Sequence, residues 1–170
     1  MSREEIFDTI TEAYEGYYNI DRDNCVKPFD AVGYLSNEAQ QYFLVKAAHI
    51  ASVNSYEYVY FKKCLKLDDA LLRELDGKAW EDGISKVKPS ADHKNTDVAL
   101  IVIADEVEDE VGNSIAEYKH SKNYKLGLYG FSNYRLVVIE APSGLVLTNR
   151  RGRDLRDFIA HTIKKVGKGV

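Results

Sequence analysis

The sequence has little cysteine, no surplus of positive charge and no long hydrophobic run. Its two cysteines, Cys25 and Cys64, match no metal-ligand spacing, which predicts free thiols in a reducing compartment rather than a disulfide framework. No stretch approaches the roughly 20 apolar residues that a membrane span needs, and the N-terminal MSREEIFDTI has no hydrophobic signal core. We therefore expect a cytoplasmic protein that does not cross a membrane.

The charge and composition limit the classes of partner and the number of domains. The formal net charge is −4, which argues against general nucleic-acid binding but leaves local basic patches open. The 170 residues are 45% apolar, so we expect a single globular domain over residues 1–170. The chain has 12 tyrosines but only 6 phenylalanines. Because tyrosine suits half-buried surfaces, a homodimer that buries Tyr-rich strands is one expected assembly.

One segment, DVALIVIAD at Asp97–Asp105, is the longest unbroken apolar run in the chain. The residues from Val98 to Ala104 carry no polar side chain and are mostly β-branched. Such a run is typical of a strand that is covered on both faces, usually in the centre of a sheet flanked by helices.

The remaining elements follow from periodicity and from turn residues. We predict helices over about residues 3–18, 68–86, 105–120 and 154–166. We predict strands at Phe29–Leu35 and Ser55–Lys63, a turn at Asn19–Pro28, and a C-terminal antiparallel meander of Tyr124–Tyr129, Tyr134–Glu140 and Leu145–Thr148. The segment Gln40–Ala51 fits either a helix or a short strand, and we favour the strand.

These elements together predict the class of fold. Helices that alternate with strands, followed by a run of strands, indicate an α/β protein of the mixed α+β kind. We expect a single three-layer domain, in which a mixed sheet with the C-terminal antiparallel meander carries helices on both faces.

A basic turn, NRRGRDLR at Asn149–Arg156, is the strongest candidate binding site. Arginine presents a planar fork of donors that suits phosphate or carboxylate, and a following helix adds its N-terminal amides. The simpler interpretation is that nearby acids such as Asp154 and Asp157 pair with these arginines at the surface, where ion pairs contribute little to stability. The predicted anion-binding residues are Arg150, Arg151, Arg153 and Arg156.

The acidic and histidine residues give weaker signals. Asp105, Glu106, Glu108, Asp109 and Glu110 follow the central strand. Carboxylates there could hold a divalent cation, but a helix cap at Asp105 with Glu108 explains them more simply. The four histidines are His49, His93, His120 and His161, and no two lie at a metal-ligand spacing. We therefore expect no bound metal and no cofactor.

Two functional classes remain open. The first is a binding protein whose arginine turn contacts an anionic ligand or a nucleic acid. The second is a metal-dependent nuclease or hydrolase, because the order helix, three strands, helix, strand resembles the restriction-endonuclease-like fold if Gln40–Lys46 is a strand. That resemblance implies an acid-x-Lys pair. Asp30 and Glu57 are the plausible acids, but Val59 stands where lysine is expected after Glu57, so we favour the binding protein.

Overall fold

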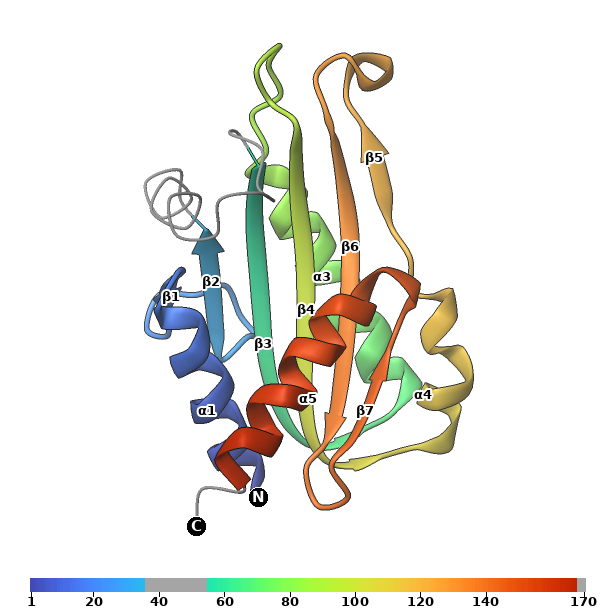
Figure 1. Ribbon diagram of the computed structural model, residues 1–170. Coiled ribbons are helices and arrows are strands. Elements are labelled where there is room, and N and C mark those ends of the chain that lie inside the picture. The colour runs from blue at the N-terminus through green and yellow to red at the C-terminus, as the bar shows by residue number, and fades with distance from the viewer. Residues whose placement is uncertain (36–54, 168–170) are drawn as a thin grey trace.

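The computed structural model describes residues 1–35 and 55–167 and contains one mixed sheet (Figure 1). The described helices are α1 (Arg3–Glu15), α3 (Asp69–Ser85), α4 (Asp109–Ser114) and α5 (Arg153–Gly167). The described strands are β1 (Asn19–Asp21), β2 (Ala31–Leu35), β3 (Ser55–Leu67), β4 (Asn95–Val107), β5 (Ser121–Asn123), β6 (Phe131–Glu140) and β7 (Leu145–Thr148). Short 3-10 helices lie at η1 (Ile115–Glu117), η2 (Lys125–Gly127) and η3 (Arg150–Gly152). None of the helices described is long and apolar enough to cross a membrane.

The sheet has the strand order β1-β2-β3-β4-β6-β5. The pairs β1–β2 and β2–β3 are antiparallel, whereas β3, β4 and β6 run parallel to one another. β5 pairs with residues 131–133 of β6 and β7 with residues 137–140, both antiparallel. Because β4 occupies one edge of β6 along its whole length, β5 and β7 share the other edge.

Strand β4 is the centre of the core, as its apolar sequence predicts. Residues 98–104 are completely buried, and alternate side chains point to opposite faces. One hydrophobic cluster contains Val98, Leu100, Val102 and Ala104 together with Leu72, Leu75 and Ala79 of α3. The other contains Ala99, Ile101 and Ile103 together with Ile6 and Ile10 of α1 and Leu155 and Ile159 of α5.

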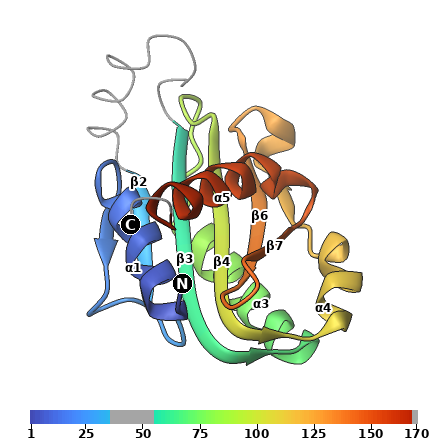
Figure 2. The same cartoon turned by 60° about the horizontal axis from the view of Figure 1, so that its bottom comes forward.

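The helices therefore cover both faces of the sheet. Figures 1 and 2 show α1 and α5 on the near face and α3 behind it. The α/β class and the mixed sheet predicted from the sequence are confirmed.

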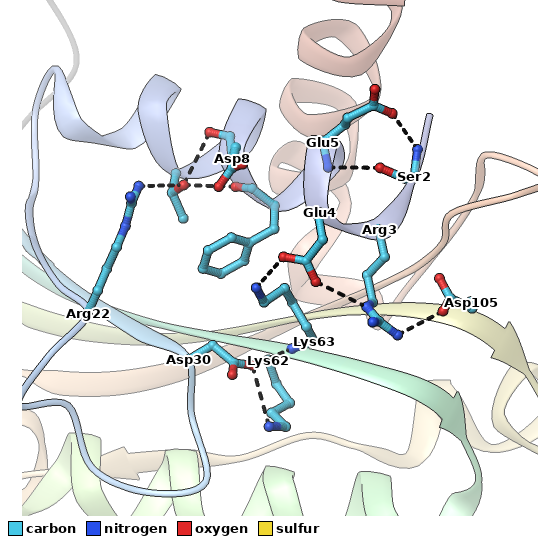
Figure 3. A network of polar contacts seen from close by, with 12 residues as sticks. Ser2, Arg3, Glu4, Glu5, Asp8, Arg22, Asp30, Lys62, Lys63 and Asp105 are labelled. Atoms are coloured by element: carbon cyan, nitrogen blue, oxygen red, sulfur yellow. Dashed lines mark hydrogen bonds and ion pairs between the residues drawn. The ribbon is translucent and has the colours of Figure 1, made fainter.

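Polar contacts fix the N-terminal end of α1 (Figure 3). Ser2 and Glu5 form a capping box, in which the Glu5 amide donates to Ser2 Oγ at 3.2 Å and the Ser2 amide to Glu5 Oε2 at 2.6 Å. Arg3 Nη1 donates to Asp105 Oδ2 at 2.8 Å, and Lys63 pairs with Glu4. These contacts tie α1 to β3 and β4.

Two predicted elements and one predicted helix cap differ from the structure. The helix predicted from residue 105 begins only at Asp109, because β4 stays paired with β3 through Leu67 and Val107. Glu108 is the N-cap residue of that helix, but its side chain makes no capping hydrogen bond. The predicted cap residue, Asp105, binds Arg3 instead. The predicted strand Tyr124–Tyr129 is largely a 3-10 turn at η2, and β5 lies just before it.

The N-terminal half also departs from expectation in one place. A short strand, β1, lies within the predicted turn Asn19–Pro28 and pairs with β2. Among the elements that the structure describes, the order helix, three strands, helix, strand therefore occurs with β1 as its first strand. The segment Gln40–Ala51, for which we favoured a strand, lies outside the described residues.

Candidate functional site

The basic turn links β7 to α5. Its shape depends on Asn149 and Gly152, which flank Arg150 and Arg151 in the sequence. The Asn149 side chain accepts from the Gly152 amide at 2.9 Å and from the Leu136 amide at 3.1 Å. A Cβ on Gly152 would lie 2.7 Å from the Leu136 carbonyl oxygen and 2.3 Å from Thr148 Oγ1. The close approach therefore requires glycine, and it turns Arg150 and Arg151 outward to solvent.

This turn forms one side of a cleft of about 810 Å³, which we call the basic cleft. Its lining residues are Ala116, Lys119, Thr148, Asn149, Arg150, Arg151 and Arg153. Four of them are cations, and no ion pair joins any of these four to an acid among the described residues. The basic cleft therefore has a local positive charge in a protein whose net charge is −4.

The fourth predicted arginine lies apart from the other three. Arg156 does not line the basic cleft. Its Nη2 donates to Asp157 Oδ1 at 2.8 Å on the exposed side of α5. The predicted surface pairing with acids thus occurs at Arg156, whereas Arg150, Arg151 and Arg153 face the cleft.

A smaller pocket of about 290 Å³ adjoins the basic cleft and shares Lys119 with it. We call it the His120 pocket. Its lining residues are Arg73, Asp76, Glu117, Tyr118, Lys119 and His120. The side-chain nitrogen of Asn149, Nδ2, donates to the Tyr118 carbonyl at 2.8 Å, so the basic turn and the wall of this pocket hold each other in place.

The His120 pocket contains a histidine and a carboxylate in direct contact. His120 Nε2 lies 2.7 Å from Asp76 Oδ2. Asp76 is a residue of α3 and is only 7% exposed, which is unusual for a carboxylate. The His120 ring stacks on Trp80, with centroids 5.1 Å apart and planes at 16°, and meets Tyr134 edge to face at 5.0 Å. These contacts hold the imidazole in one orientation.

Burial and neighbouring charge shift the pKa values of two tyrosine phenols around this pocket. Burial raises the pKa of Tyr134 well above its usual value, and the nearby Asp76 carboxylate raises it further. Burial, with the hydrogen bond to Asp69, likewise raises the pKa of Tyr118. Tyr118 Oη donates to Asp69 Oδ1 at 2.7 Å, and this bond is the largest cause that lowers the pKa of Asp69. Both phenols therefore stay neutral, and Tyr118 acts as a donor.

The sequence identifies the arginines of the cleft but not Lys119 or the Asp76–His120 pair. Asp76 and His120 are 44 positions apart, and we regarded each histidine as ordinary. One signal was present, since Asp76 follows Leu72 by four residues and precedes Ala79 by three. A carboxylate on the apolar side of a helix needs a buried partner.

The other predicted sites do not gather into a binding arrangement. Of the acids at the end of β4 and just beyond it, Asp105 pairs with Arg3, while Glu106 and Glu108 each lie 2.9 Å from Lys66 Nζ. Glu57 binds Arg135 and Tyr18, whereas Asp30 contacts Lys62, so the two acids of the nuclease hypothesis have separate partners. Within residues 1–35 and 55–167, no group of three or more His, Cys, Asp or Glu side chains could hold a metal ion.

Comparison with known proteins adds a family. A family model described as "Domain of unknown function (DUF8052)" matches residues 2–161. No curated protein and no solved structure matches the chain.

Proposed function

The chain belongs to the DUF8052 family, a domain of unknown function, and we propose from its own residues that it is a binding protein for a small phosphate-bearing anion. The observation that carries this proposal is the basic cleft. Lys119, Arg150, Arg151 and Arg153 line one hollow and make no ion pair within the described part of the chain.

The chemistry of these side chains favours phosphate. A guanidinium donates two parallel hydrogen bonds to a phosphate or carboxylate, and such charge-assisted bonds are about twice as strong as neutral ones. The cleft also lies at the start of α5, where the helix dipole contributes positive potential. An anion that enters the cleft therefore meets several donors and no competing carboxylate among the lining residues.

The distribution of charge favours a small ligand over a nucleic acid. A nucleic-acid surface usually extends over many phosphates and leaves a basic footprint. Here four cations that make no ion pair within the described residues gather in one cleft, and the whole chain carries a net charge of −4. A cytoplasmic location and assembly as a homodimer stay predictions.

We expect the triple variant Arg150→Ala, Arg151→Ala, Arg153→Ala to lose at least about 30-fold in affinity for inorganic pyrophosphate. Losing charge-assisted hydrogen bonds worth about 2 kcal/mol in total gives that factor. Isothermal titration calorimetry at low ionic strength measures the change. The control is the triple variant Arg156→Ala, Lys164→Ala, Lys165→Ala, which removes the same charge from α5 outside the cleft and should retain wild-type affinity.

Two results would contradict this proposal. The first is wild-type protein that binds no pyrophosphate at low ionic strength, and the second is an equal loss in both triple variants. If single-stranded DNA bound more tightly than pyrophosphate with the same dependence on the three arginines, a nucleic acid would replace the small anion as the ligand.

A second candidate function, hydrolysis of an ester in the bound anion, is favoured by the Asp76–His120 contact. With Nε2 held by Asp76 Oδ2, Nδ1 of His120 can take a proton from a water molecule whose oxygen bonds to phosphorus, while the bond from phosphorus to the ester oxygen breaks and the alcohol leaves. The pocket that contains this pair adjoins the basic cleft at Lys119.

For this candidate, we expect wild-type protein to release nitrophenol from p-nitrophenyl phosphate, and His120→Asn to slow release by about 10²–10⁴-fold. Pyrophosphate affinity should stay unchanged in this variant, because His120 does not line the basic cleft. The control is His161→Asn on the exposed side of α5. Release by wild type no faster than in buffer would remove hydrolysis as a candidate and leave anion binding intact.

A further inference from the structure

A third hollow, of about 310 Å³, lies on the opposite face of the sheet, between the C-terminal end of α1 and the first turns of α5. We call it the aromatic pocket. Its lining residues are Ala13, Tyr14, Tyr17, Tyr18, Leu35, Glu57, Arg135, Asp154, Leu155 and Phe158. Four of these are aromatic, and the charged ones are two acids and one arginine. This composition differs from that of the basic cleft in both polarity and sign of charge.

Glu57, which lines the aromatic pocket, lies beside a second acid from the neighbouring strand. Glu57 of β3 and Asp97 of β4 are directly paired in register and point to the face that α1 and α5 cover. Like charges that face each other across paired strands repel. Glu57 is 8% exposed, so solvent screens this repulsion poorly.

A single guanidinium serves both carboxylates. Arg135 of β6 donates from Nη2 to Glu57 and lies 3.6 Å from Asp97 Oδ2. Tyr18 donates its hydroxyl to the other oxygen of Glu57. Asp97 Oδ1 is buried without a hydrogen-bond partner among the described residues.

The pocket and the groups beside it contain more carboxyl groups than cations. Glu57 and Asp97 share one guanidinium, and Asp154 at the pocket wall adds another carboxyl group. Burial raises the pKa of Glu57, and Asp97 raises it further, against the lowering effect of Arg135. A ligand that carries a positive charge would favour the charged form of Glu57 and pair with it.

We propose that the aromatic pocket binds a small organic cation, an ammonium group with apolar substituents. The faces of Tyr14, Tyr17, Tyr18 and Phe158 suit the substituents and attract the charge through cation–π interactions. Glu57 and Asp154 supply opposite charge. The volume lies at the lower end of the range of ligand pockets, about 300–1,000 Å³, so the ligand is small.

This binding is independent of the proposed anion function. The aromatic pocket and the basic cleft share no lining residue. A neutral apolar molecule and a simple metal cation are the competing occupants. The aromatic walls disfavour a strongly hydrated metal ion, and the buried negative charge disfavours a neutral molecule.

A pair of isosteric probes tests the sign of charge directly. Choline and 3,3-dimethylbutan-1-ol have the same shape, but only choline is charged. We expect isothermal titration calorimetry to show at least about tenfold tighter binding of choline, since cation–π and Coulombic attraction amount to one or two kcal/mol. Glu57→Gln and Phe158→Ala should each weaken choline binding several-fold. The matched control is Glu12→Gln, which removes an exposed acid of α1 that does not line the pocket.

The other outcomes decide against the organic cation. Equal affinity for the two probes would show a neutral apolar site, and competition by millimolar sodium or potassium would show a simple cation site. Absence of choline binding to folded wild-type protein would also overturn the proposal. Phe158 is 46% exposed, so Phe158→Ala keeps the fold and remains informative even if Glu57→Gln unfolds the protein.

Discussion

Replacing Asn149 by alanine is expected to lower the free energy of unfolding by about 3–5 kcal/mol. Asn149 is 2% exposed. Its side chain accepts from the amides of Leu136 and Gly152 and donates to the carbonyls of Tyr118 and Tyr134, at distances from 2.8 to 3.4 Å. Alanine removes all four bonds, although the Gly152 amide keeps a bond to the Asn149 carbonyl at 3.2 Å. Each buried group that is left unpaired costs about 1–3 kcal/mol.

Urea unfolding followed by circular dichroism measures this loss. The control is Asn123→Ala in the exposed strand β5, which should change stability by less than about 0.5 kcal/mol. A loss below about 1 kcal/mol for Asn149→Ala would show that the basic turn does not depend on this side chain. Because Asn149 positions the turn, the variant should also bind pyrophosphate more weakly under conditions in which it is folded.

Replacing Arg135 by methionine is expected to destabilise the protein by about 3–5 kcal/mol at neutral pH. Methionine keeps most of the side-chain volume but leaves Glu57 and Asp97 facing each other without the cation between them. Adding Glu57→Gln should recover much of the loss, because only one carboxylate then remains. The control is Arg73→Met, which breaks an exposed pair with Asp69 and should cost less than about 1 kcal/mol.

The stability of the Arg135→Met variant should depend on pH, and the titration of Glu57 sets the direction of this dependence. The folded-state pKa of Glu57 lies above the ordinary value of 4.5, so the folded state binds more protons than the unfolded state above that value. Stability therefore falls as pH rises from the ordinary pKa through the raised one. Arg135 lowers the pKa of Glu57, and its removal extends this fall to higher pH.

Urea unfolding of Arg135→Met at pH about 5 and about 8 tests this sign, with greater stability expected at the lower pH. The double variant Arg135→Met, Glu57→Gln should show a weaker dependence. Equal stability of Arg135→Met at both pH values would mean that Glu57 does not titrate in that range and that the two carboxylates are not strongly coupled.

The sequence predicted the elements whose burial is encoded locally. The run Val98–Ala104 is apolar on every side and could only be a covered strand. The capping box at Ser2 and Glu5 located the start of α1 within one residue. By contrast, the extension of β3 and β4 beyond their apolar parts depends on parallel pairing between them. No local pattern records this pairing, so the start of α4 was predicted too early.

The candidate sites divide in the same way. Arg150, Arg151 and Arg153 are close in sequence, so their concentration of charge is visible without a structure. Glu57 and Arg135 are 78 positions apart. They meet only because β3, β4 and β6 are neighbours in one particular register. Strand order decides such contacts, and sheet order cannot be deduced from the periodicity of single strands.

Consecutive residues of β6 serve opposite sides of the molecule. Tyr134 reaches the His120 pocket, and Arg135 reaches the floor of the aromatic pocket. A slip of β6 by a single position would exchange them, placing a guanidinium against the Trp80 and His120 rings and a phenol between two carboxylates. The hydrophobic residues that follow would tolerate the slip better, since both of their faces are apolar. Selection on this strand should therefore act on its register as much as on its composition.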